Sequence, residues 1–346
     1  MRFLFAEKLR IFPFLIVLFL CCLLICGCGG SSSSNGGPAY ISKIYLAGRG
    51  NDIAVFNVDL LTREASIIIS GANQIYGVAV SPSSSLLYAV DGSGGNRKIY
   101  SYDLESSSTD QIDVGSLDSS GFGHYVTVTP NGGRVLAPSK SFAGVFSFLS
   151  SPISLEKFAT TEGIGSDWCL GIQADDNYAY IADTGTKGII FKYDISAQTI
   201  VASVEIPSNG GPWHIKFNPS KDKIYVPAIN LDKVFVLDVA AFSFEAGSIS
   251  VGDNPTDIGF TSGGKAYVVN YLDSTVSVVN VSTGQVITTI TDQYGSKPNS
   301  LIVDNARGRV YLNSTTMSML SVIDTVSDTI VATYELSSTT DQMAAK

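Results

Sequence analysis

The sequence predicts an all-β fold: a seven-bladed β-propeller of four-stranded antiparallel blades, closed by the C-terminal strand pairing with the N-terminal blade. The main observation is a repeat of short β-prone segments, each centred on a large residue ahead of a turn. The seven central residues are Tyr45, Tyr88, Leu136, Tyr180, Tyr225, Tyr267 and Tyr311. Successive centres lie 43, 48, 44, 45, 42 and 44 residues apart. Such a period, with several short strands in each unit, is typical of propeller blades.

Each unit is predicted to contain four strands in the same order. In the second unit, an alternating apolar strand that includes Val78 comes first, and the polar turn 81–83 follows it. Next come the strand centred on Tyr88 and a third strand that ends at Asp103. A last strand closes the blade, as residues 201–206 do in the fourth unit. Short strands separated by turn residues indicate a hairpin-connected antiparallel sheet.

Two units depart from this pattern. In the third unit, Leu136 stands where the others have tyrosine, and the third strand, 145–148, lacks the terminal aspartate. The first unit begins at its tyrosine strand and therefore lacks an innermost strand. Residues 340–345 follow the last outer strand where another innermost strand would begin. We expect them to pair with residues 41–47, because an open propeller would expose two sheet edges.

The N-terminal residues predict segments outside the propeller. A basic start is followed by an apolar run of 15 residues, 11–25, which suits a secretory signal better than a membrane-spanning helix. A Gly/Ser-rich stretch then reads as a flexible tether. The predicted organisation is a signal peptide at 1–27, a lipidated cysteine with its tether at 28–38, and the propeller at 39–346.

The end of the apolar run carries a short motif, Ile25-Cys26-Gly27-Cys28. It resembles the lipobox of bacterial lipoproteins, and the resemblance implies that Cys28 becomes lipidated and N-terminal. The expected localisation is that of an exported bacterial lipoprotein, at the outer membrane or on the cell-surface or periplasmic side. The membrane would then be a partner through the anchor at Cys28. The alternative is an ordinary secretory signal with incidental cysteines.

Charge and cysteine content narrow the possible partners. The chain carries a net charge of −9, and removal of the predicted signal makes it about −11. This acidic balance argues against binding to nucleic acid. Beyond the signal and the motif only Cys169 remains, so no internal disulfide is possible, and we expect Cys169 to be a buried small apolar residue. We expect a monomeric domain.

The best-preserved repeats resemble a known family. The segment Ala266-Tyr267-Val268-Val269-Asn270, followed by residues 274–280 and Thr283-Gly284, is similar to the repeat named for its Tyr-Val-Thr-Asn motif in surface-layer and surface-antigen proteins. This YVTN-repeat resemblance implies a structural role for the motif residues. The same superfamily includes seven-bladed lactonases, so the resemblance also leaves an enzymatic function as an alternative.

Aligned on the apolar pairs, one residue per blade is predicted to start each innermost strand and to face one mouth of the central channel. These residues are Tyr76, His124, Trp168, Trp213, Thr256, Asn299 and Asp341. Their immediate successors are Gly77, Tyr125, Cys169, His214, Asp257, Ser300 and Gln342. Both tryptophans and both histidines of the chain fall in these two sets. Amphipathic rings suit a recognition surface, whereas the alternative is that they plug the channel.

The predicted ligand-binding residues are therefore Tyr76, His124, Trp168, Trp213, His214, Thr256 and Asn299. The loops after the tyrosine strands are expected to share this mouth, and they contain Arg49, Asp52, Asp91, Asn230, Asn270 and Asp273 among others. For any single one of these loop residues, the favoured interpretation is a solvated turn residue.

Three functions remain open on the sequence. The first is a binding or scaffold lipoprotein that holds a protein, peptide, glycan or small ligand at the aromatic mouth. The second is a lactone hydrolase, with His124 or His214 as general base and Asp257 or Asp341 orienting it. The third is a propeller that binds a haem- or quinone-related cofactor. The sequence itself requires no cofactor.

No metal site is predicted. The glutamates beyond the signal fall in or near the outermost strands, away from the channel where a gluconolactonase-like metal would activate water. Two histidines from non-adjacent blades are a weak metal signal.

Overall fold

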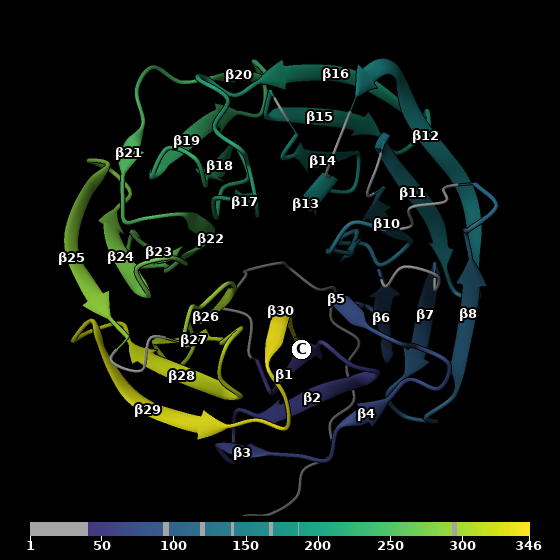
Figure 1. Ribbon diagram of the computed structural model, residues 1–346, viewed down its shortest axis with the longest axis horizontal. Coiled ribbons are helices and arrows are strands. Elements are labelled where there is room, and N and C mark those ends of the chain that lie inside the picture. Colours follow the sequence, from purple (N-terminus) through teal and green to yellow (C-terminus); the bar gives the residue numbers. More distant parts are fainter. Residues whose placement is uncertain are drawn as a thin grey trace, which may run out of the picture. The chain divides into compact units, whose positions relative to one another are not determined.

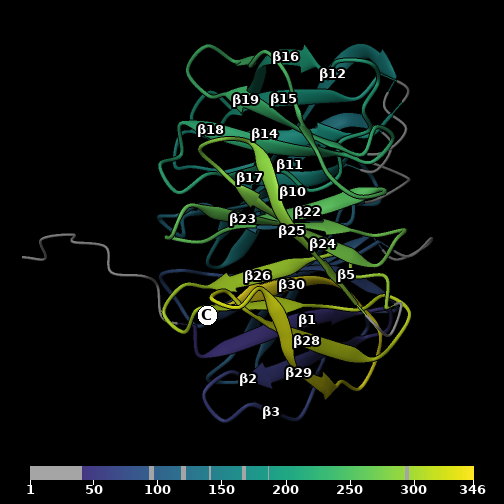
Figure 2. The same cartoon turned by 90° about the vertical axis from the view of Figure 1, so that its left-hand side faces the viewer.

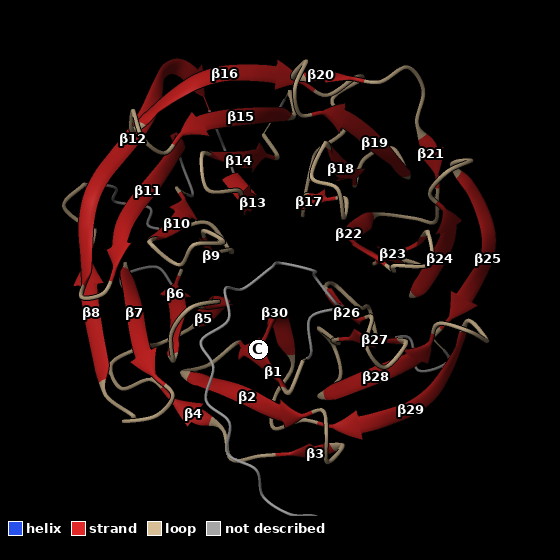
Figure 3. Ribbon diagram, turned by 180° about the vertical axis from the view of Figure 1, so that it is seen from behind, coloured by secondary structure: helices blue, strands red, loops and turns tan. Residues whose placement is uncertain are grey.

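The computed structural model describes residues 41–92, 97–117, 122–139, 142–165, 169–185, 187–292 and 296–346. The predicted signal peptide, Cys28, the tether and Trp168 lie outside these residues. The described chain forms seven antiparallel sheets arranged in a ring (Figure 1), and no helix is present among them (Figure 3). The prediction of an all-β, seven-bladed propeller is confirmed.

The strands take the same four positions in every blade, from the channel to the rim. The innermost strands are β30 (Thr340–Ala345), β5 (Ile75–Val80), β9 (Thr127–Val128), β13 (Cys169–Ala174), β17 (Lys216–Phe217), β22 (Pro255–Phe260) and β26 (Leu301–Asp304). The second strands are β1 (Lys43–Gly48), β6 (Leu86–Asp91), β10 (Arg134–Pro138), β14 (Tyr178–Asp183), β18 (Lys223–Ala228), β23 (Lys265–Asn270) and β27 (Arg309–Leu312).

The two outer positions complete the blades. The third strands are β2 (Asp52–Asn57), β7 (Lys98–Asp103), β11 (Phe142–Ser150), β15 (Ile189–Asp194), β19 (Lys233–Asp238), β24 (Thr275–Asn280) and β28 (Met319–Asp324). The rim strands are β8 (Thr109–Asp113), β12 (Ile153–Gly165), β16 (Thr199–Glu205), β25 (Gln285–Thr291) and β29 (Thr329–Glu335). In two blades the rim strand is split, into β3 (Thr62–Arg63) with β4 (Ile67–Ile68) and into β20 (Ser243–Phe244) with β21 (Ile249–Ser250).

The C-terminal strand closes the ring as the sequence predicts. β30 pairs antiparallel with β1, with Leu46 opposite Met343 and Gly48 opposite Thr340. Figures 1 and 2 both show β30 beside β1, and Figure 1 shows β30 on the side of β1 that faces the centre of the ring. The first blade is therefore built from both ends of the propeller, and β1 is paired on both sides.

The apolar core lies between neighbouring blades. One cluster joins Leu46 and Phe56 of the first blade to Tyr311 of the seventh. The second-strand tyrosines Tyr88 and Tyr180 are fully buried in equivalent clusters. Each second strand is buried on both faces between neighbouring blades, so a large apolar side chain is needed at the same position in each repeat. Cys169 is buried in the cluster that includes Tyr193, as the sequence predicts.

Two glycines allow the innermost strands to approach closely around the channel. A Cβ atom on Gly77 would lie 2.5 Å from the carbonyl oxygen of His124 in the next blade, and one on Gly171 would lie 2.1 Å from that of Trp213. Because any side chain would collide there, these glycines fix where the backbones of His124 and Trp213 lie.

In the described part of the chain, no helix has the length and apolar character needed to cross a membrane.

Candidate functional site

A small cavity of about 220 Å³ opens where the innermost strands begin. We call it the cup. It is lined by Arg49, His124, Trp213, Asn254, Thr256, Tyr271, Asn299, Thr315 and Asp341. These residues come from five of the seven blades, so the cup lies at the centre of the ring.

Five of the cup residues are among those that the sequence predicts at the mouth. His124, Trp213 and Asn299 precede the innermost strands of their blades, whereas Thr256 and Asp341 lie within β22 and β30. Tyr76, which is also predicted at the mouth, does not line the cup but stacks on His124, with ring centroids 4.5 Å apart and an interplanar angle of 4°. The edge of Trp213 faces His124 at 6.4 Å. The rings of Tyr76, His124 and Trp213 therefore form one aromatic group at the cup.

The cup is also lined by an ion pair that joins the two ends of the propeller. Arg49 donates from Nε and Nη2 to the two carboxylate oxygens of Asp341, each at 3.0 Å. Asp341 has a side chain that is 8% exposed, against 51% for Arg49. The hydrogen bond to Asp341 is the main cause that raises the pKa of Arg49. Because the pair is bidentate, it fixes both groups in one plane and cancels their charge.

Asp341 is held in place through its backbone. Asn313 donates from Nδ2 to the carbonyl oxygens of Thr340 and Asp341, at 2.7 and 3.1 Å. Asn299 donates from Nδ2 to the same Asp341 carbonyl oxygen at 3.2 Å. Asn313 also accepts from the backbone N–H groups of Asn299 and Ser300. The closing strand and the start of β26 are thus tied together directly beside the cup.

Tyr125 does not itself line the cup but lies directly behind two residues that do, Trp213 and Asn299. Its hydroxyl oxygen accepts hydrogen bonds from Nε1 of Trp213 at 3.1 Å and from Nδ2 of Asn299 at 3.4 Å. Burial, and then the nearby Asp341 carboxylate, raise the pKa of the Tyr125 phenol well above its usual value. The phenol is therefore neutral at physiological pH.

His214 and Asp257 form a buried pair one layer below the cup lining. Nδ1 of His214 lies 3.3 Å from Oδ2 of Asp257, and Nζ of Lys216 lies 3.9 Å from Oδ1. Asp257 also accepts from the backbone N–H of Ile258 and of Leu301, each at 2.9 Å. Within the described residues, Nε2 of His214 has no hydrogen-bond partner.

Burial decides the protonation of this pair. Burial lowers the pKa of His214 and outweighs the opposite influence of Asp257. Burial alone would raise the pKa of Asp257, but Lys216, His214 and the Leu301 N–H hold it below the usual value. A neutral imidazole beside an ionised carboxylate follows.

The sequence alignment places His214 and Asp257 near the mouth, but neither lines the cup. Each follows a cup residue directly, and alternate side chains of a strand point in opposite directions. The ring of His214 packs edge-on against Tyr125, with centroids 4.0 Å apart. Both rings border a small cavity of about 20 Å³, with Gln342 and Lys216. Such a volume has room for one water molecule.

Four further cup residues are not among those predicted to start the innermost strands. Arg49, Tyr271 and Thr315 lie just after the second strands β1, β23 and β27. The loops after the second strands are expected at the mouth, and Arg49 is among the residues predicted there. An alignment of the first residues after each second strand would have found Tyr271 and Thr315 as well. Asn254 lies in the connection before β22, and no repeated feature marks it.

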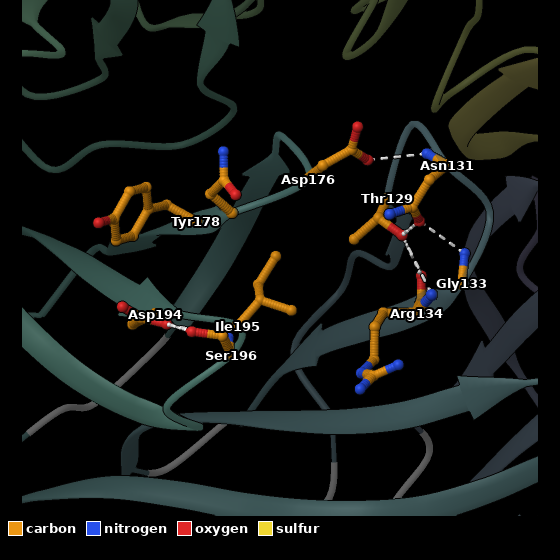
Figure 4. Close-up of a pocket in the computed structure, with 10 residues that line it drawn as sticks. Thr129, Asn131, Gly133, Arg134, Asp176, Tyr178, Asp194, Ile195 and Ser196 are labelled. Atoms are coloured by element: carbon orange, nitrogen blue, oxygen red, sulfur yellow. Dashed lines mark hydrogen bonds between the residues drawn. The ribbon is translucent and has the colours of Figure 1, made fainter.

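A larger cavity of about 420 Å³ lies at the other end of the innermost strands (Figure 4). Several of its polar groups are already used within the fold. Asp176 accepts from the backbone N–H of Asn131 at 2.8 Å, and Asp194 accepts from the N–H groups of Ser196 and Ala197. These contacts are typical of turn capping, so the cup is the better candidate site.

No group of three or more histidine, cysteine, aspartate or glutamate side chains able to hold a metal ion occurs among the described residues.

Comparison with known proteins gives one family and several similar folds. A family model described as "Lactonase, 7-bladed beta-propeller" matches residues 39–343. No curated protein matches the chain significantly. Similar solved structures include the dihydro-heme d1 dehydrogenase NirN in complex with DHE, with 12% identity and a TM-score of 0.63. The match covers 88% of this chain, and this chain spans only 66% of NirN.

Two other structures match over nearly their whole length. Kuenenia stuttgartiensis hydrazine synthase has 12% identity and a TM-score of 0.68, and the match covers 85% of this chain and 97% of that one. Apo AztD from Citrobacter koseri has 11% identity and a TM-score of 0.62, with 88% and 97% covered. At these identities the likeness concerns the fold alone.

Proposed function

Because the chain belongs to the seven-bladed β-propeller lactonase family, we propose that the cup binds a small polar ring compound, of the size of a monosaccharide or its lactone. The size of the cup supports this ligand class. Pockets for drug-sized ligands span roughly 300–1,000 Å³, and the cup has about 220 Å³. A tetrapyrrole of the haem type is too large for it, so the cofactor hypothesis is not carried further.

One observation carries the proposal. Thr256 lines the cup and is 2% exposed, yet its hydroxyl has no hydrogen-bond partner within the described residues. A buried polar group without a partner costs about 1–3 kcal/mol and calls for an explanation. A ligand hydroxyl or ring oxygen in the cup would supply the missing partner. Asn299 and the Asp341–Arg49 pair supply further polar groups around the same space.

Hydrolysis of a bound lactone is the second candidate, and it rests on His124. This histidine lines the cup, and stacking on Tyr76 fixes its ring plane. In such a reaction, imidazole would remove a proton from water as the water oxygen attacks the ester carbonyl. The ring C–O bond would then break, and the leaving alkoxide would take the proton. His214 is less suited to act as the general base, because it lies beneath the cup and is only 5% exposed.

The test uses the protein from Pro38 onward, since residues 38–346 form a separate compact unit. We would measure binding of monosaccharides, aldonolactones and their open-chain acids by calorimetry, and hydrolysis of the lactones by pH-stat. We expect binding by at least one ring compound and a loss of about fivefold in Thr256→Val, which removes one hydrogen-bonding group. Tyr178→Phe, in the cavity at the other end of the strands, is the matched control.

The outcomes separate the two candidates. Binding without turnover supports a binding protein, whereas turnover lost in His124→Gln with binding retained supports the hydrolase. Absence of binding by every ring compound, or binding unchanged in Thr256→Val, would overturn the proposal.

We also propose that the protein acts at a membrane. The lipobox-like motif supports lipidation of Cys28, and the tether would leave the propeller free in the exported compartment. A peptide or glycan partner at the mouth is compatible with this arrangement. Cys28→Ser should release the protein from the membrane fraction, and retention of that variant would contradict the anchor.

A further inference from the structure

The hydroxyl of Tyr125 lies beside two residues of the cup lining, and its proton has no acceptor within the described residues. We propose that Tyr125 donates a hydrogen bond into the cup and so selects ligands that place a carbonyl oxygen near this hydroxyl. The inference rests on the proposed ligand site and adds to it a residue that determines specificity.

The acceptor capacity of this hydroxyl is already filled. A phenol oxygen accepts at most two hydrogen bonds and donates one. Trp213 has only a donor at Nε1, and this donor contacts Tyr125 at 3.1 Å. Asn299 supplies the second donor at 3.4 Å.

The orientation of the Asn299 amide is fixed by a second contact. Its Nδ2 also donates to the carbonyl oxygen of Asp341 at 3.2 Å. A flipped amide would bring two oxygens together there, so Nδ2 must be the atom that faces Tyr125. The O–H of Tyr125 therefore points away from both Trp213 and Asn299.

The surroundings direct that O–H toward the cup. The ring of Tyr125 borders the cavity of about 20 Å³ and packs against His214. Its oxygen, at the far end of the ring, lies between Trp213 and Asn299, which both line the cup. The residue is 3% exposed, so water reaches it little, and a ligand in the cup is the natural acceptor.

The hydroxyl is a well-prepared donor. Two hydrogen bonds received by the oxygen polarise the O–H bond and strengthen its own donation. Because the phenol stays neutral at physiological pH, it offers a proton and repels no carbonyl dipole. If the lactone carbonyl is attacked by water, negative charge grows on its oxygen, and a donor already in place stabilises that charge.

The experiment pairs two probes that differ only at the predicted contact. Glucono-δ-lactone carries a carbonyl at C1, and 1,5-anhydroglucitol is a similar ring with a methylene there. We would measure both affinities for the wild type, Tyr125→Phe and the control Tyr180→Phe. Tyr180 also has a buried hydroxyl, which has no partner within the described residues, and it lies in the core away from the cup.

We expect Tyr125→Phe to weaken lactone binding about fivefold, the loss of one neutral hydrogen bond, and to leave 1,5-anhydroglucitol binding unchanged. Tyr180→Phe should leave both unchanged. Equal losses for both probes in Tyr125→Phe would mean a merely structural role and would overturn the inference, and so would no loss for either.

A ligand-free crystal structure provides a second test that does not depend on the probes. An ordered water in the cup within hydrogen-bond distance of the Tyr125 oxygen supports the inference. A side chain or carbonyl group accepting from this hydroxyl refutes it. If the wild type binds neither probe, the proposed ligand class fails, and this structure still decides whether Tyr125 donates into the cup.

Discussion

A shift of one residue along an innermost strand decides whether a side chain reaches the cup or the layer beneath it. Trp213 and Thr256 line the cup, whereas His214 and Asp257, their successors, are buried below. The two positions consequently favour different chemistry. The first suits reversible contact with a ligand, and the second holds a charge that only neighbouring groups can balance.

The buried position of His214 predicts a pH dependence of stability. Its pKa is lowered in the folded protein, so the unfolded chain binds the proton more strongly. The contribution of His214 to the free energy of unfolding is fully present above its unfolded-state pKa of about 6.5. It declines as pH falls below that value, until the lowered folded-state pKa is reached. Urea unfolding between pH 8 and pH 5 should show this decline, which His214→Gln should reduce.

His124→Gln is the control for that experiment, because the chain has only two histidines. His124 lies at the cup and is only partly buried, so this variant should keep the decline of the wild type. If His214→Gln lost stability with falling pH as much as the wild type does, His214 would not be the group responsible for the decline.

The ion pair in the cup predicts a change in ligand charge preference. In Asp341→Asn, the Arg49 guanidinium loses its carboxylate partner and becomes available to an anionic ligand. We expect affinity for an open-chain aldonate to rise about two- to fivefold, the range of a partly exposed ion pair, and to fall again with added salt. Calorimetry at two salt concentrations would measure the affinity for the aldonate. An affinity that changed neither with the substitution nor with salt would contradict the prediction.

At the scale of the strand, glycines control how near the innermost strands come to one another. Side-chain patterns in the sequence reveal the strands and the tyrosine positions, because burial on both faces imposes a period of two. The close approach of β13 to the backbone of Trp213 leaves no such mark. Gly171 looks like any strand glycine in the sequence, and its role follows only from the packed ring.

Gly171→Ala tests this role. Its methyl group would collide with the Trp213 carbonyl oxygen, and overpacking of this kind costs about 1–3 kcal/mol. We expect a lower unfolding free energy and weaker binding in the cup, measured by urea unfolding and calorimetry. Gly263→Ala is the control, since its nearest neighbouring atom would lie 3.8 Å away. Equal stability of the two variants would contradict the close-approach argument.

At the scale of the whole molecule, the repeat and its missing first strand are enough to predict the ring and its closure. They are also enough to place His124, Trp213, Thr256, Asn299 and Asp341 at one mouth. The depth of each side chain is harder to predict, because a register error of one residue exchanges the two layers. Pairings such as Arg49 with Asp341 join residues 292 positions apart, which no local pattern reveals.

Asn313 tests how far ring closure contributes to stability. Its buried amide joins the start of β26 to the closing strand by four hydrogen bonds. Asn313→Ala would leave several buried backbone groups unpaired, at about 1–3 kcal/mol for each group not reached by water. We expect a loss of about 3 kcal/mol or more in urea unfolding. Asn280 is half-buried at the end of β24 and caps only the turn that follows. Asn280→Ala should therefore cost far less, and similar losses in both variants would argue against the closure role.

Closure of the ring by β30 also sets an order of events during synthesis. The strand that completes the first blade is made last, so its partner β1 must wait for almost the whole chain. Pairings between such distant segments form slowly, and an unfinished blade offers an open edge to other chains in the meantime. Arg49 and Asp341 meet only when this last strand docks. A functional cup would therefore be a sign of completed folding, and a chain stalled or cut before residue 340 would have neither the ring nor the site.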